Sequence, residues 1–148
     1  MKKLISTAML VSMLVLAIMT TSVNAQTPNF SKESVWTVSM VSTKANMGVE
    51  YLNSLKANWK AIHDEAIAQG LIISYKILSG AAANPGDFDV MLMVESKNLA
   101  AIEGNEEKWE AIRKKVIGGE DAAKSLNQSR VNVRDMYGSK IMREIKYK

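Results

Sequence analysis

The sequence of 148 residues contains no cysteine. This absence excludes disulfide bonds, thiol catalysis, thiolate metal sites and a lipid-anchored cysteine, so the hydrophobic core alone must hold the fold. The chain also contains a single histidine, which is too few imidazoles for an ordinary protein metal site, and we expect neither a metal nor a cofactor. Gly-rich phosphate loops, nucleophile elbows and HExxH motifs are missing as well. Without these motifs, the sequence does not indicate a particular reaction.

Strong charge of one sign is also lacking. The formal net charge is +4 at pH 7, and Lys2 and Lys3 at the N-terminus contribute two of those charges. No basic stripe with interleaved aromatic residues is present, so we expect no nucleic-acid partner. Beyond the N-terminal run, no apolar stretch is long enough to cross a bilayer, and we expect no stable membrane span in the mature chain.

The N-terminal segment has the pattern of a secretory signal. Lys2 and Lys3 supply a positive start, an apolar run extends from Leu4 to Met19, and Val23-Asn24-Ala25 offers small residues at the spacing of a signal peptidase site. This pattern predicts a signal peptide over residues 1–25 and a periplasmic or secreted mature protein.

The rest of the chain is expected to contain a flexible lead-in at residues 26–34 and one domain at residues 35–148. Changes of hydrophobic period predict strands at 35–41, 71–78, 88–95 and 139–147, and helices at 47–69, 99–116 and, as a short addition, 120–128. Without that addition, the order is the βαββαβ order of an α+β, ferredoxin-like fold. Right-handed crossovers then place both helices on one face of a four-stranded antiparallel sheet.

The opposite face of this sheet is expected to need a cover. It presents Met91 and Met93 beside Asp89 and Glu95, which is too apolar a surface to be left fully in water. A second copy of the chain is the simplest cover, so we expect a homodimer.

Four features carry a resemblance to a known family: Trp59 in the first helix, the passage from Gly70 to Leu78, the start Phe88-Asp89-Val90, and the closing run from Gly138 to Ile145. With the order of elements, they resemble the dimeric α/β-barrel superfamily, and more narrowly its small exported bacterial members of unassigned function. The resemblance implies two sheets packed face to face into a barrel, with the helices outside. Enzymes of that superfamily include cofactor-free monooxygenases, haem-degrading oxygenases and isomerases, whereas other members are plain dimeric domains.

The haem-degrading activity is not carried over to this chain. That branch takes an asparagine, a tryptophan and a histidine from separate elements, whereas Asn58, Trp59 and His63 all fall on one predicted helix.

A ligand pocket, if one exists, is expected between the sheet and the helices. Trp59 and Trp109 lie on the predicted inner stripes of the two helices and Tyr75 on a strand beneath them, so these three rings are expected to line it. His63 is the only side chain whose ordinary pKa lies near neutrality, and it follows Trp59 by one helical turn. It is expected either at the rim of that pocket or as a half-exposed helix residue without a function.

Arg143 is a further candidate for ligand binding. It shares a strand face with Ile141 and Ile145, so we expect it to be partly buried. A buried guanidinium needs a carboxylate or carbonyl partner inside the protein, or an anionic ligand.

The sequence is compatible with two functions and does not decide whether the protein is an enzyme. The first is an exported homodimeric domain that lacks catalysis or binds a small apolar ligand. The alternative is a cofactor-independent monooxygenase or isomerase that acts on an aromatic or lipid-like molecule. A closed apolar cavity into which His63 or Tyr75 reaches favours the alternative, and a filled core with His63 in solvent favours a domain without catalysis.

Overall fold

The computed structural model describes residues 28–148 of the chain, so the expected signal peptide at 1–25 lies outside the described residues. The centre of the described part is one antiparallel sheet with the strand order β2-β3-β1-β4. Its strands are β1 (Phe30–Thr43), β2 (Ser74–Ser79), β3 (Val90–Ser96) and β4 (Arg134–Tyr147).

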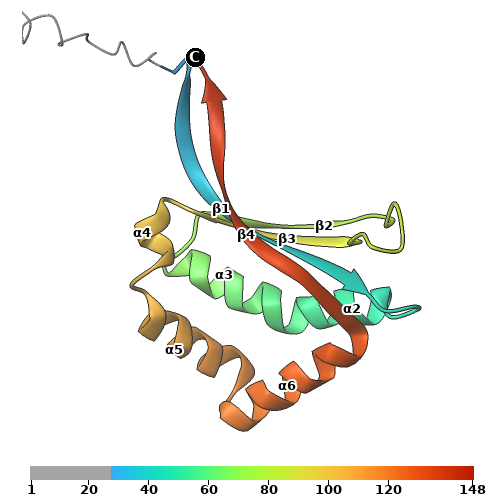
Figure 1. The fold of residues 1–148 in the computed structure, drawn as a ribbon. Coiled ribbons are helices and arrows are strands. Elements are labelled where there is room, and N and C mark those ends of the chain that lie inside the picture. Colours follow the sequence, from blue (N-terminus) through green and yellow to red (C-terminus); the bar gives the residue numbers. More distant parts are fainter. Residues whose placement is uncertain (1–27) are drawn as a thin grey trace, which may run out of the picture.

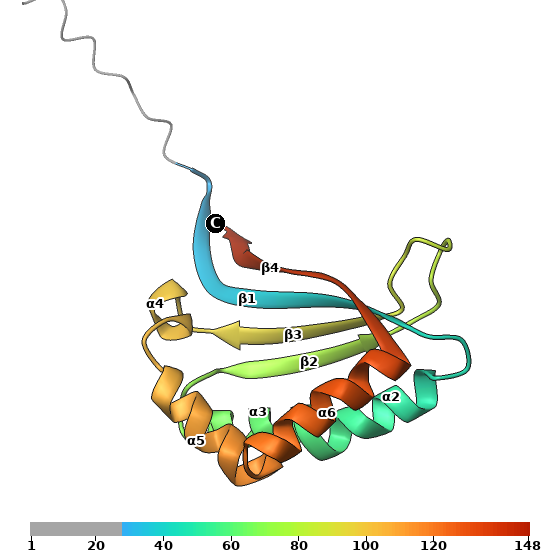
Figure 2. The same cartoon turned by 60° about the horizontal axis from the view of Figure 1, so that its bottom comes forward.

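Helices α2, α3, α5 and α6 lie on one side of the sheet, and none of them covers the other side (Figures 1 and 2). Their bounds are α2 (Gly48–Leu55), α3 (Ala61–Ala68), α5 (Glu106–Ile117) and α6 (Glu120–Val133). The expected α+β architecture with a four-stranded antiparallel sheet is therefore confirmed, and it is compatible with a ferredoxin-like fold.

The first helical region is close to the predicted one, but it is not uniform. A π turn, η1 (Lys56–Lys60), joins α2 to α3, and the hydrophobic period did not predict it. The region ends as expected at Gly70, whose φ of 68° suits glycine. There the backbone N–H of Leu71 donates to the carbonyl of Ala66 over 2.9 Å, which satisfies one of the last helical carbonyls.

The predicted helix at 99–116 is wrong as a single element. The structure has a short α4 (Leu99–Ile102), capped by the side chain of Asn98, and then α5. Gly104 separates them with a φ of 78°, a conformation that breaks a helix and that glycine adopts at little cost. Helix α6 in turn continues past the predicted end at residue 128.

The two terminal strands are longer than expected. Strand β1 begins at Phe30, inside the segment expected to be a flexible lead-in, because its first residues pair with the end of β4. Phe30 lies opposite Tyr147, with their rings edge to face at 6.4 Å. These paired ends project from the body of the molecule as a two-stranded arm (Figure 1).

The core between the helices and the sheet has two ends. The first, which we call the filled end, contains Val41, Tyr51, Leu55, Val90, Leu92 and Val133. The second, which we call the aromatic end, contains Ile62, Ala66, Leu71, Ile72 and Ile112, with the half-buried Trp109 packed against it. Trp59 packs against the filled end, so its ring lies where the two ends meet. No helix within residues 28–148 is both long and apolar enough to cross a membrane.

Candidate functional site

A cavity of about 380 Å³ lies between the sheet and the helices. Its volume falls in the range typical of small-molecule sites, roughly 300–1,000 Å³. Strands β1 and β3 contribute Thr37, Val94 and Ser96, and the first helical region contributes Trp59, Ile62 and His63. The remaining wall comes from Ile72, Ala101, Ile102, Trp109, Arg113 and Arg130. Apolar groups predominate, with a few polar side chains among them.

Four aromatic side chains form one cluster at this cavity: Trp59, His63, Tyr75 and Trp109. The rings of Trp59 and His63 are stacked, with centroids 3.9 Å apart and planes at 29°. Tyr75 meets the Trp59 ring edge to face at 5.2 Å, and Trp109 lies 5.8 Å from the His63 ring. The structure therefore brings together the four aromatic residues that the sequence singled out, from two helical regions and one strand.

His63 is held in one tautomer by the helix that carries it. Its Nδ1 lies 2.6 Å from the carbonyl oxygen of Trp59, so in the neutral ring Nδ1–H donates this bond and Nε2 is left unprotonated. Burial lowers the pKa of His63 below its ordinary value of 6.5, and this outweighs the opposite effects of the Trp59 carbonyl and Asp64. A neutral imidazole with a free basic nitrogen is the resulting species at neutral pH.

The π turn η1 lies directly before this imidazole. It carries Trp59, and α3 begins with Ala61, two residues before His63. Single π turns within α-helices recur at functional sites, because they change the direction of the side chains that follow. The local backbone is therefore irregular where the aromatic cluster begins.

Tyr75 packs against the cluster from outside the cavity. Its hydroxyl donates to Asp64 Oδ1 over 2.7 Å, and Lys60 Nζ lies 2.5 Å from the other oxygen of the same carboxylate. Burial, and secondly the bond to Asp64, raise the pKa of Tyr75, so its hydroxyl stays protonated at neutral pH. Tyr75 thus positions the rings of Trp59 and His63 and does not itself line the cavity.

Arg143 does not belong to this site, and the expectation that it is partly buried is wrong. It is exposed on the outer half of β4, and its Nη1 lies 3.5 Å from the carbonyl of Glu33. Ile141 and Ile145 on the same strand face are 54% and 42% exposed. The reason is that β4 is an edge strand of the sheet, and its outer half, which ends in the arm, lies beyond the helices (Figure 1).

Sequence reasoning missed the two arginines of the cavity, Arg113 and Arg130. A signal for Arg130 was present in the spacing of α6. The partly or fully buried residues of that helix are Ala123, Leu126, Arg130 and Val133, which recur at steps of three and four. The short predicted helix ended at residue 128, so Arg130 and Val133 were not recognised as part of this stripe.

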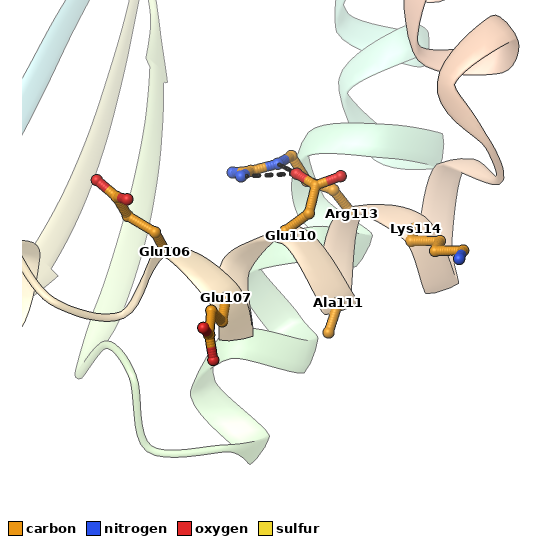
Figure 3. A pocket seen from close by; sticks show the side chains of 6 residues that line it. All are labelled: Glu106, Glu107, Glu110, Ala111, Arg113 and Lys114. Carbon is orange, nitrogen blue, oxygen red and sulfur yellow. Dashed lines mark hydrogen bonds and ion pairs between the residues drawn. The ribbon is translucent and has the colours of Figure 1, made fainter.

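Another hollow lies on the outer side of α5, and it has the character of an ordinary surface. Its lining side chains come from this one helix, and most of them are charged (Figure 3). Arg113 and Glu110 pair there at 3.0 Å. A depression over one polar helix face encloses no ligand, so the aromatic cavity remains the candidate site.

Within residues 28–148, no three His, Asp or Glu side chains lie close enough together to hold a metal ion. Comparisons with models of known protein families, with curated proteins and with solved structures gave no match. The function proposed below is therefore inferred from the geometry of the cavity.

Proposed function

We propose that this protein binds a small aromatic or otherwise apolar molecule in the cavity between its helices and its sheet. The observation that carries the proposal is the aromatic lining of about 380 Å³ of space by the stacked pair Trp59 and His63 and by Trp109, which is tilted against His63. Half-buried aromatic faces at such a space offer a ligand apolar area and ring stacking together. The few polar groups among them supply orientation.

A neutral fluorescent probe, N-phenylnaphthylamine, tests this proposal. In a Trp36→Phe background, the remaining tryptophans are Trp59 and Trp109, both of which line the cavity. We expect the probe to quench their emission and to gain fluorescence itself, with saturation at one site per chain. No saturable change up to the solubility limit of the probe would contradict ligand binding.

A cavity-filling variant locates the site. Ala101 lines the cavity from α4, so Ala101→Phe is expected to occupy the space and to abolish probe binding. Ala111→Phe is the matched control, because Ala111 lies exposed on the outer side of α5. Equal binding by both variants would place the probe elsewhere on the protein.

We further propose that the protein is a homodimer whose subunits pack through the sheet face without helices, giving an α/β barrel. The register places Met40 opposite Met91, and Met91 opposite Leu78, so an apolar row crosses three strands of this face. Leu78 is 52% exposed in the single chain. Lys76 and Glu95 stand on the same face, so it carries both signs of charge, which lets two copies of the face pair opposite charges across a two-fold axis.

Light scattering at micromolar concentration tests the dimer. We expect twice the mass of the mature chain, and we expect Met91→Asp to shift the protein toward monomer because it buries an unpaired charge. Ala111→Asp, outside the proposed interface, is the control and should stay dimeric. A monomeric wild-type protein would refute the barrel.

Export is part of the same proposal and rests on the N-terminal segment. The expected mature protein begins at or near Gln26 and resides in the periplasm or outside the cell. N-terminal sequencing of the exported protein tests this, and a product that still begins at Met1 would refute it.

A second candidate function, a cofactor-independent oxygenase or isomerase, is favoured by one observation. His63 presents a neutral imidazole to the cavity, with its proton held on Nδ1 by the carbonyl of Trp59. Both reaction types begin with removal of a proton from the substrate, and the free Nε2 is suited to accept it.

Oxygen uptake with dihydroxynaphthalene as the substrate tests the oxygenase. We expect turnover by the wild type and its loss in His63→Gln, while the binding of N-phenylnaphthylamine persists. Turnover that does not depend on His63 would overturn the assignment of that residue as the base. If the wild type binds the probe but shows no turnover, the ligand-binding proposal stands and the oxygenase proposal is rejected.

A further inference from the structure

The cavity lining includes two arginines that differ in their partners. Arg113 of α5 is neutralised by Glu110, since its Nη2 and Nε lie 3.0 and 3.1 Å from Glu110 Oε2 (Figure 3). Arg130 of α6 has only a long contact, 3.5 Å from its Nη1 to the amide oxygen of Asn127. Among residues 28–148, no carboxylate lies within ion-pair distance of Arg130. Its charge is therefore not compensated within the described chain.

Arg130 lies on the buried side of its helix, where a charged side chain without an acidic partner is unusual. It stands in the buried stripe of α6, between Leu126 and Val133, where an amphipathic helix ordinarily carries an apolar side chain. Val131, the next residue, is 64% exposed, so the helix turns an aliphatic group outward and a guanidinium inward. Partial burial of a guanidinium without an acidic partner costs free energy. An anion bound from outside the chain would supply the missing partner.

A second cation lies one turn further along the chain. Arg134 is half-buried with its guanidinium 5.7 Å from the centre of the Tyr51 ring, and its Nε has no hydrogen-bond partner within residues 28–148. Partial burial, and secondly the positive charge of Arg134, lower the pKa of Arg130, although an arginine stays protonated at neutral pH. Arg130 thus gives the cavity lining a positive charge, and Arg134 lies close enough to reinforce it although it does not line the cavity.

We propose that the ligand of this cavity is an aromatic carboxylate, with its ring system against Trp59 and Trp109 and its acid group bound by Arg130. The proposal rests on the ligand-binding function above and names the class of ligand. A guanidinium matches a carboxylate in a bidentate, charge-assisted geometry. Ser96, which is 4% exposed, and Thr37 add hydroxyl groups from the sheet side of the same cavity.

Two probes of the same shape but different charge test the proposal. Naphthoate is ionised at about pH 7.5, well above an ordinary carboxyl pKa near 4, whereas naphthamide is neutral. Calorimetric titration of the wild type is expected to show naphthoate bound at least about tenfold more tightly, as a charge-assisted hydrogen bond provides. Arg130→Gln should remove this preference and leave the affinity for naphthamide within about threefold of the wild type.

Three further measurements separate binding from structure. Arg130→Lys keeps the charge and should keep a preference for naphthoate. Lys124→Gln changes the charge on the exposed side of the same helix and should alter neither affinity. Thermal unfolding of ligand-free Arg130→Gln is expected to match or exceed that of the wild type, because no internal ion pair is lost.

The possible outcomes distinguish this proposal from the binding function beneath it. If neither probe, nor N-phenylnaphthylamine, binds to the wild type, the binding function fails and the carboxylate assignment fails with it. If naphthoate and naphthamide bind equally, or if Arg130→Gln keeps the preference, the cavity binds a neutral ligand and only the carboxylate assignment is overturned.

Discussion

The two ends of the core lie under the same sheet face, yet they are packed differently. At the filled end, Tyr51 is 1% exposed and Leu55 3% exposed, so the helix and the sheet close directly on each other. Toward the aromatic end, Trp59, His63 and Trp109 are only half-buried, and a cavity separates them from β1 and β3. Large rings are present in both places, so ring size alone does not fill a core. The difference indicates that one end stabilises the fold and the other leaves room for a ligand.

The largest effect is expected from truncation at the filled end. Tyr51→Ala removes a fully buried ring and should lower the free energy of unfolding by about 3–5 kcal/mol. Tyr51→Phe, which keeps the ring, should cost less than about 1 kcal/mol. Urea titration followed by circular dichroism measures both changes. A loss below about 1 kcal/mol for Tyr51→Ala would show that this end is not closely packed.

Truncation at the cavity should cost less. Trp109→Ala removes a half-buried ring that already borders empty space, so we expect a loss of about 1–2 kcal/mol. The same urea titration compares it with Tyr51→Ala, while titration with N-phenylnaphthylamine should show weaker binding. Equal losses of stability at the two ends would remove the contrast and favour a core filled throughout.

His63 gives the aromatic end a dependence on pH just below neutrality. The folded state lowers the pKa of His63, so between that value and about 6.5 the unfolded chain binds more protons. The stability from the neutral ring is therefore fully present above about pH 6.5 and is lost as the pH falls, by at most about 1.4 kcal/mol per unit. Urea titrations from about pH 5 to 7 should show this slope in the wild type and a flatter one in His63→Gln. Identical slopes would mean that His63 is accessible to water in the folded state.

The smallest effect is expected on the arm. Arg143→Ala replaces an exposed side chain with one weak contact to a backbone carbonyl, so stability should change by less than about 0.5 kcal/mol. Naphthoate binding should also be unchanged, in contrast to Arg130→Gln. A loss of binding in Arg143→Ala would return Arg143 to the ligand site and would imply that the arm folds over the cavity.

The contrast between the two arginines shows how far a sequence pattern reaches. Arg143 alternates with Ile141 and Ile145, which predicts a buried face, yet no helix extends over that part of β4. Arg130 lies beyond the predicted end of its helix at residue 128, yet α6 continues and turns this side chain inward. Periodicity tells which residues share a face, but not whether another element covers that face.

The sequence by itself determined the order of strands and helices, because β-branched alternation and helical stripes are local properties of neighbouring residues. It also placed Trp59, Tyr75 and Trp109 on surfaces that turn toward one another, since their periods and the topology of the sheet agree. Only the tertiary structure decided that space remains beside Trp59 and Trp109, that Tyr75 lies outside it, and that Arg130 lines it. That outcome depends on how closely α3, α5 and α6 approach the sheet, and this distance is set by side-chain volumes from segments far apart in the chain.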